Sequence, residues 1–161
     1  MSTIITKAKT ILQKAGFNPI NSPNNEEVFF LPSLNGKNGG QFNITFVGRD
    51  ASNDIDAILL VITEFPIKVP PNKRDKMLNF LNMLNSDAWY TWLSLDMKNG
   101  GIVCKSSGRS KSTASLNEDI LEILLFSTIS RLDALQPFIM DIIYSEKSLE
   151  TLIKEMNPSA K

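Results

Sequence analysis

Apolar residues recur at helical spacing at the start of the chain. Six of them lie three and four positions apart and would share one stripe of a helix: Ile4, Ile5, Ala8, Ile11, Leu12 and Ala15. Ser2 or Thr3 can cap the start of this helix, and Gly16 can end it. Residues 17–25, which are rich in Asn, Ser and Pro, predict a loop after it.

Three apolar runs then follow at 27–31, 41–49 and 55–65, separated by turn residues. In the second run, Phe42, Ile44 and Phe46 alternate with polar residues, which is typical of a strand with one buried face. The third run is apolar on both faces between positions 57 and 62. We therefore expect three antiparallel strands, with the third one central beneath a helix or a partner.

A helix and then a β-hairpin are expected after the third strand. Pro66 and the pair Pro70–Pro71 end the third strand and can begin a helix, whose apolar stripe is Met77, Leu78, Leu81 and Leu84. Residues 89–97 and 101–105 predict a hairpin that turns at Asn99 and Gly100.

A long helix is expected from Ser115 or Asn117 to about Leu135, where Pro137 either kinks it or begins a new segment through Tyr144. A short amphipathic helix is expected over 148–156. The sequence thus predicts an α+β fold in the order α-β-β-β-α-β-β-α, with helices on an antiparallel sheet of about five strands. The core would span about 2–145, and a helical tail about 148–157.

Composition favours one globular domain over 1–161, because 42% of the 161 residues are hydrophobic and 21% are charged. Lys plus Arg and Asp plus Glu both count 17, so no net charge attracts nucleic acid, and we expect none as a partner. The N-terminus does not resemble a signal peptide. The apolar stretch 120–144 carries four charges, which disfavours a membrane span, so we expect a cytoplasmic protein.

Several short motifs accompany this order of elements. They are Val69-Pro70-Pro71-Asn72-Lys73-Arg74, Leu81-Asn82-Met83-Leu84-Asn85, Leu95-Asp96, Asn99-Gly100-Gly101 and a long apolar helix after them. In these features the chain resembles the YbjN family of bacterial proteins. The resemblance implies the fold of type III secretion chaperones, small dimers that hold extended segments of client proteins on apolar patches. It implies no catalytic motif.

The residue types exclude several chemistries. The chain has no histidine and a single cysteine, Cys104, so it lacks an internal disulfide, a multi-thiolate zinc site and the commonest general base. Cys104 is expected to be a packed thiol. Asp54 and Asp56 could hold a cation, but a solvated start of a strand is favoured. Glu118, Asp119 and Glu122 fit the first turns of a helix, where negative charge is stabilising. We expect no enzyme, no cofactor and no metal.

The Ser-rich segment 106–115 has no counterpart in the resemblance. Its Arg109 and Lys111 could bind an anion together with backbone amides, although a mobile polar loop is favoured. A small-ligand sensor or hydrolase is the alternative function, and it would need a polar pocket that joins Asp96 or Glu122 to Arg109.

Two apolar surfaces are candidates for partner contact. Trp89, Tyr90 and Trp92 cannot all lie on one face of a strand, so they indicate either exposed aromatic surface or packing on both faces. The arc around Ile123 and Phe126 is wider than one sheet face needs, so it belongs either to the core or to a second subunit. We expect a non-enzymatic protein-binding module, chaperone-like or regulatory, that forms a homodimer and binds an unknown protein client.

Overall fold

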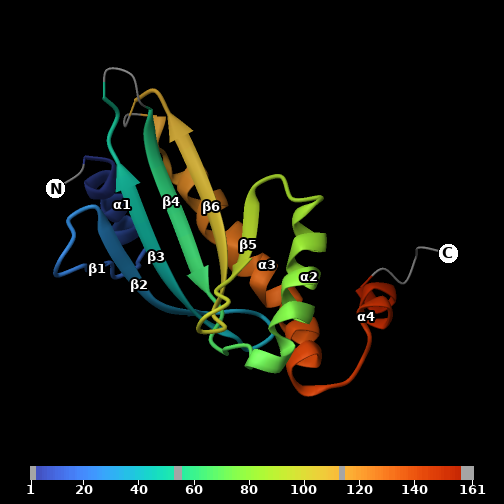
Figure 1. Ribbon diagram of the computed structural model, residues 1–161. Helices are drawn as coiled ribbons and strands as arrows, with labels where there is room; N and C mark the ends of the chain where they lie inside the picture. Colours follow the sequence, from blue (N-terminus) through green and yellow to red (C-terminus); the bar gives the residue numbers. More distant parts are fainter. Residues whose placement is uncertain (1–2, 53–55, 113–114, 157–161) are drawn as a thin grey trace.

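The computed structural model describes residues 3–52, 56–112 and 115–156. Over these residues the chain forms an antiparallel sheet with strand order β1-β2-β3-β4-β6-β5, together with helices α1 to α4 (Figure 1). The strands are β1 (Ile20–Asn21), β2 (Val28–Asn35), β3 (Gln41–Arg49), β4 (Ala57–Glu64), β5 (Thr91–Leu95) and β6 (Ile102–Ser110). The helices are α1 (Thr3–Lys14), α2 (Arg74–Asn85), which follows the short 3₁₀ turn η1 (Pro71–Lys73), α3 (Glu118–Tyr144) and α4 (Leu149–Met156). The predicted α+β class is confirmed, with six strands among the described residues instead of about five.

The strands alternate between buried and less buried side chains. In β3 the predicted residues Phe42, Ile44 and Phe46 are buried, and in β4 the same holds for Leu59 and Val61. These side chains meet α1 and α3, which lie on the same side of the sheet (Figure 1). We call this side the covered face and the opposite side the open face. As expected, β4 is central, between β3 and β6.

Helix α3 runs through Pro137 to Tyr144, so of the two predicted alternatives the one in which a new segment begins at Pro137 is wrong. It begins as expected at Asn117, whose side-chain oxygen accepts the Ile120 N–H at 2.9 Å. Among the described helices α3 is long and apolar enough to cross a membrane, but its apolar side packs on the sheet. Packing in the hydrophobic core therefore accounts for the apolar character of α3.

Proline at position 137 removes the helical N–H that would bond the carbonyl of Asp133. That carbonyl instead accepts the side-chain amide of Asn38 at 2.9 Å, and the Asp133 carboxylate accepts the Asn38 backbone N–H at 3.0 Å. Asn38 belongs to the predicted turn between β2 and β3. We call this set of bonds the Asn38–Asp133 clamp, and it explains how a proline is tolerated inside α3.

Glycines let the β2–β3 turn approach α3 closely. A Cβ on Gly36 would overlap the Asp133 carboxylate and lie 2.9 Å from the Phe42 ring. Gly39 has φ +84°, a left-handed conformation that side chains other than glycine rarely adopt. The glycines therefore allow the turn both to close the β2–β3 hairpin and to pack directly against α3.

Two of the motifs that carry the family resemblance meet in space. Arg74, which begins α2, donates to the carbonyls of Met97 and Lys98 at 2.8 and 3.1 Å, in the turn between β5 and β6. The Val69 N–H donates to the Gly100 carbonyl at 2.8 Å. The motif residues thus have a structural role, which is to hold α2 against the β5–β6 turn.

Arg131, one of the charged residues of α3, has a structural role. Its guanidinium donates to the Thr91 carbonyl of β5 at 2.8 Å and to the Leu84 carbonyl at the end of α2 at 2.7 Å. A hydrogen bond from a charged donor to a partly buried carbonyl is stronger than a neutral one. Arg131 therefore fastens α2 and β5 to α3.

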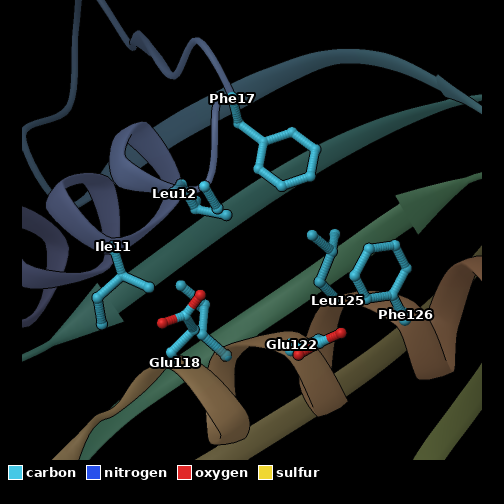
Figure 2. Close-up of a pocket in the computed structure, with 9 residues that line it drawn as sticks. Ile11, Leu12, Phe17, Glu118, Glu122, Leu125 and Phe126 are labelled. Atoms are coloured by element: carbon cyan, nitrogen blue, oxygen red, sulfur yellow. The ribbon is translucent and has the colours of Figure 1, made fainter.

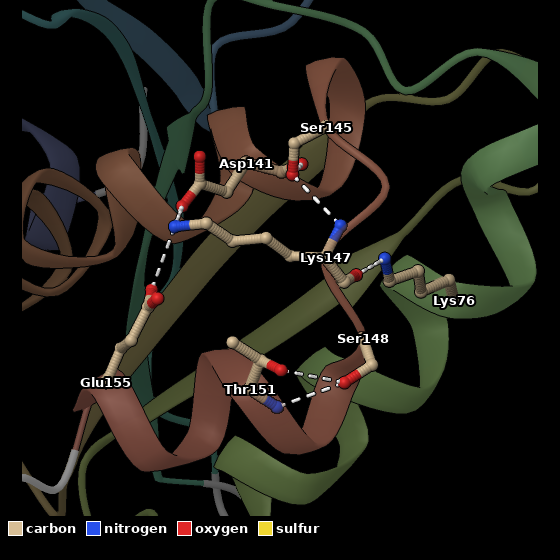
Figure 3. Close-up of polar contacts among 7 residues, drawn as sticks. All are labelled: Lys76, Asp141, Ser145, Lys147, Ser148, Thr151 and Glu155. Atoms are coloured by element: carbon tan, nitrogen blue, oxygen red, sulfur yellow. Dashed lines mark hydrogen bonds and ion pairs between the residues drawn. The ribbon is translucent and has the colours of Figure 1, made fainter.

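The predicted tail helix is confirmed as α4, and polar contacts hold it near the end of α3 (Figure 3). Lys147 bridges Asp141 of α3 at 2.8 Å and Glu155 of α4 at 3.0 Å. The Ser148 hydroxyl accepts the Thr151 N–H at 3.2 Å, as an N-cap does. Leu152 is buried, so α4 also adds to the core.

Several predicted boundaries are wrong. Residues 106–110 are the end of β6 and not a loop, because Ser106 to Ser110 pair with β4 from Val61 to Ala57. Small residues in this part of β6 allow α3 to pack closely on the strand, since a Cβ on Gly108 would lie 3.1 Å from Leu124. The predicted loop 17–25 contains β1, β2 continues to Asn35 through a register shift, and β5 begins at Thr91.

The start of α1 is capped from a distant part of the chain. The carboxylate of Asp50, directly after β3, accepts the N–H groups of Thr3 and Ile4 at 2.6 and 2.8 Å. Thr3 is thus a donor to the cap and not the cap that the sequence suggested, while Ser2 lies outside the described residues. Negative charge at a helix N-terminus is also favoured by the helix dipole.

The clamp predicts a coupling between two residues far apart in the sequence. Asn38→Ala should lower the free energy of unfolding by about 1–3 kcal/mol, because the Asp133 carbonyl loses its donor. In a Pro137→Ala background the same change should cost markedly less, since the restored Ala N–H can bond that carbonyl. Urea unfolding of the four proteins measures this coupling, and equal costs in both backgrounds would contradict it.

Candidate protein-binding surfaces

An apolar groove lies between the end of α1 and the first turns of α3. It encloses about 230 Å³, and Figure 2 shows side chains of both helices directed toward it. Its residues are Ile11, Leu12, Ala15 and Phe17 on one side and Glu118, Leu121, Glu122, Leu125 and Phe126 on the other. We call it the α1–α3 groove.

Phe17 reaches the groove because of how α1 ends. Gly16 adopts φ +87°, and the N–H of Phe17 donates to the Leu12 carbonyl at 2.9 Å. This is the Schellman ending, in which an apolar residue after the glycine commonly packs back on the last helical turn. The sequence prediction that Gly16 ends the helix is confirmed, but it left Phe17 in a loop and missed its role.

A further cavity adjoins the groove along α3 beyond Phe126. This second cavity, of about 540 Å³, is also lined by Phe17 and Phe126, so the two cavities adjoin at these side chains. Further along, its walls are Ile129, Ser130 and Ala134 of α3 together with Leu34 and the β2–β3 turn. Phe126 is 42% exposed at the junction of the two cavities.

The rim of the groove is acidic at its α3 end. Glu118 and Glu122 line the first cavity, and Asp119 and Glu122 lie beside Ile123 and Phe126 on the outer side of the helix. Within the part of the chain that the structure describes, no lysine or arginine forms an ion pair with these three carboxylates. The groove therefore combines an apolar floor with a negative rim.

The open face of the sheet is a second apolar surface. Its central strand, β4, presents Ile58, Leu60 and Ile62, and none of these side chains is fully buried. Trp89, Tyr90 and Trp92 gather with Leu60 and Lys105 around a shallow hollow at the β5 side. They are 89%, 75% and 58% exposed, so these aromatic rings form surface and are not packed inside.

The five residues predicted to contact a partner thus fall on two separate surfaces. Trp92 pairs with Lys105 on the open face, with Trp89 and Tyr90 beside it. Ile123 and Phe126 lie on α3, which packs on the covered face. The structure leaves all five side chains exposed, whereas partner contact stays a prediction, and one continuous interface cannot include both groups.

The proposed anion site does not have the expected form. Arg109 lies on β6 and pairs with Asp56 at 3.6 Å, while Lys111 is exposed just after the strand. Asp54, the other member of the predicted carboxylate pair, lies outside the described residues. No group of three or more His, Cys, Asp or Glu side chains in the described ranges could hold a metal ion.

The polar pocket that the alternative function requires is not formed. Asp96 lies in the β5–β6 turn, where the N–H groups of Lys98 and Asn99 bond its carboxylate and lower its pKa. Arg109 lies at the opposite end of β6, and Glu122 lies on the helix side of the sheet. These three residues therefore do not share a site.

Cys104 is fully buried on the covered face, as the sequence predicted. Burial raises the pKa of its thiol to about 11, although the nearby charge of Arg131 and the Thr91 hydroxyl act in the opposite direction. A thiol in this state is a poor nucleophile.

The fold is similar to that of a known protein. YbjN from E. coli, put forward as a regulator of transcription, aligns with a TM-score of 0.55 and 13% identity over 84% of this chain and 96% of that one. No protein-family model and no curated protein sequence matches the chain. The chain thus has a YbjN-like fold, as its motifs suggested, and membership of the family stays a prediction.

The burial of Cys104 predicts its reactivity. With a pKa of about 11, roughly one thiol in a thousand is ionised at pH 8. The native protein should therefore fail to react with Ellman's reagent at pH 8 over minutes, and should release one equivalent of the coloured thiolate in denaturant. Rapid stoichiometric reaction of the native protein would contradict the packing of β6 against α3.

Proposed function

We propose that this protein is a non-enzymatic binding module, chaperone-like or regulatory, and that it holds an amphipathic helix of a partner protein in the α1–α3 groove. The two adjoining apolar cavities along α3, which share Phe17 and Phe126, are the observation that carries the proposal. The YbjN-like fold is compatible with a non-enzymatic regulatory module. A cytoplasmic location is part of the same proposal.

The main chain of the groove walls favours a helix over an extended segment. In the first cavity both long walls are helices, whose N–H and C=O groups bond mostly within the helix; beyond Phe126 only the α3 wall is helical. An extended segment would find few main-chain partners there, and buried main-chain groups without partners are costly. A helix satisfies its own main chain and needs to supply only an apolar face.

The charge of the rim indicates the polar face of the partner. Glu118, Asp119 and Glu122 are negative and have no cationic partner among the described residues. Lys or Arg residues that flank the apolar stripe of the bound helix would complement them and would speed association. The partner segment is therefore an amphipathic helix with basic flanks.

Anion binding by the Ser-rich segment is supported less well. Arg109 already has Asp56 as its ionic partner at 3.6 Å, and much of the segment is paired in β6. Among the described residues, the pair with Asp56 is the ionic contact that Arg109 makes, and Lys111 makes none.

A designed peptide tests the groove directly. A fluorescein-labelled 18-residue peptide with Leu at helical spacing and Lys elsewhere should bind, and the same peptide with Glu in place of Lys should not. Phe126→Glu should weaken binding of the Lys peptide at least tenfold. A tenfold loss of affinity corresponds to about 1.4 kcal/mol, which the loss of the apolar contact made by the Phe126 ring can supply. Fluorescence polarisation measures each affinity.

Two controls distinguish binding in the groove from non-specific binding of the peptide to exposed apolar surface. Tyr144→Glu changes an exposed aromatic residue on the same helix outside the groove and should leave affinity unchanged. Glu122→Lys on the rim should weaken binding, whereas Glu150→Lys on α4 should not. If Phe126→Glu and Tyr144→Glu bind alike, or if the Glu peptide binds as well as the Lys peptide, the proposal is wrong.

A further inference from the structure

We infer that the open face of the sheet is the interface between two copies of this chain, packed face to face with their β4 strands antiparallel. This surface is separate from the α1–α3 groove, and the inference does not depend on the proposed function. It rests on the strand register, the chemistry of the face and the position of its charges.

The register defines the open face as rows of residues across the strands. One row is Phe30, Thr45, Ile62, Lys105 and Trp92, and the next is Val28, Val47, Leu60 and Ser107. In both rows the positions on the central strands are apolar or Thr. Aliphatic and aromatic side chains on the solvent side of a sheet usually mark an interaction surface.

Most charges on this face lie near its two ends; Lys105, in the row of Ile62, lies between them, and Arg109 is paired with Asp56. Glu64 is at the end of β4 and is exposed. Arg49 and Arg109 are at the other end, on either side of Ile58, with which both pair in the register. Glu64 and Arg49 thus lie at opposite ends of the face along the strand direction, with Lys105 in the row of Ile62 between them.

A two-fold axis can relate the two sheets in either of two ways. With the axis parallel to the strands, each row faces itself, so Glu64 meets Glu64 and Arg49 meets Arg109. With the axis perpendicular to the strands, the row of Glu64 faces the row of Ile58, which places each Glu64 near Arg49 and Arg109 of the other copy. Like charges at an interface are costly, so the second arrangement is favoured.

The second arrangement also matches the apolar rows. The row of Ile62 faces the row of Leu60, so aliphatic residues of β4 meet at the centre. Trp92 of one copy comes near Tyr90 of the other at the rim. Sheets that pack in this aligned way cross at about 30° and keep such contacts near their centre.

The size of the face suits a stable dimer. Five strands spaced about 4.8 Å apart and about seven residues at about 3.4 Å each give a flat footprint of roughly 550 Å². Side chains raise the accessible area above the flat footprint, toward the roughly 800 Å² per partner of a standard interface. The α1–α3 groove stays outside the interface, because it lies on the covered side.

Sedimentation velocity across about 1 to 200 μM tests the interface, with circular dichroism to confirm folding of each variant. The wild-type chain should dimerise. Glu64→Arg and Arg49→Glu should each weaken dimerisation at least tenfold, and the double variant should recover most of the loss. Within one chain the two residues lie at opposite ends of adjacent strands, so recovery reports contact between copies.

Other outcomes would overturn the inference. A monomer at all concentrations would leave the open face to a different protein. A dimer that is strengthened by the neutral substitution Glu64→Gln would have Glu64 against Glu64, with the axis parallel to the strands. A dimer that Ile62→Lys does not weaken, while Ile123→Lys on α3 does, would use the helical side instead.

Discussion

The packing of α3 across one face of the sheet is the contact on which the other features depend. The helix is fixed at three levels: the buried hydroxyls of Thr63 and Thr128 lie 2.6 Å apart, Arg131 reaches β5 and α2, and the Asn38–Asp133 clamp holds the turn beneath Pro137. Apolar burial supplies most of the stabilisation. The polar contacts select one position of the helix among many that would bury similar area.

This arrangement creates both candidate surfaces. Because α1 and α3 both lie on the covered face (Figure 1), the end of α1 and the first turns of α3 leave an apolar groove between them. Because no described helix packs on the other side, β4 keeps an aliphatic row toward solvent. A central strand that is apolar on both faces therefore has one face in the core and one available to another chain.

The sequence predicted most elements because their spacing is local. The stripe of α1, the alternation in β3 and the Asn99–Gly100 turn depend on neighbours a few residues apart. Long-range features could not be predicted: the cap of α1 comes from Asp50, and the donor that permits Pro137 comes from Asn38. The Ser-rich end of β6 resembled a loop because local propensity favours turns, but pairing with β4 decides its structure. Among the site residues, the sequence left exposure or burial of Trp92 and Phe126 open, because only the register and the packing of α3 decide it; their separation on two faces likewise required the register.

The central claim is that the groove and the open face are independent surfaces. Carbene footprinting read by mass spectrometry at about 1 and 200 μM tests it most directly, because it labels exposed side chains wherever they lie. The account predicts that high concentration protects the β5 peptide with Trp92 and the β4 peptide with Ile62, while labelling of Phe126 on α3 is unchanged. Protection of Phe126 together with Trp92, or of neither, would contradict it.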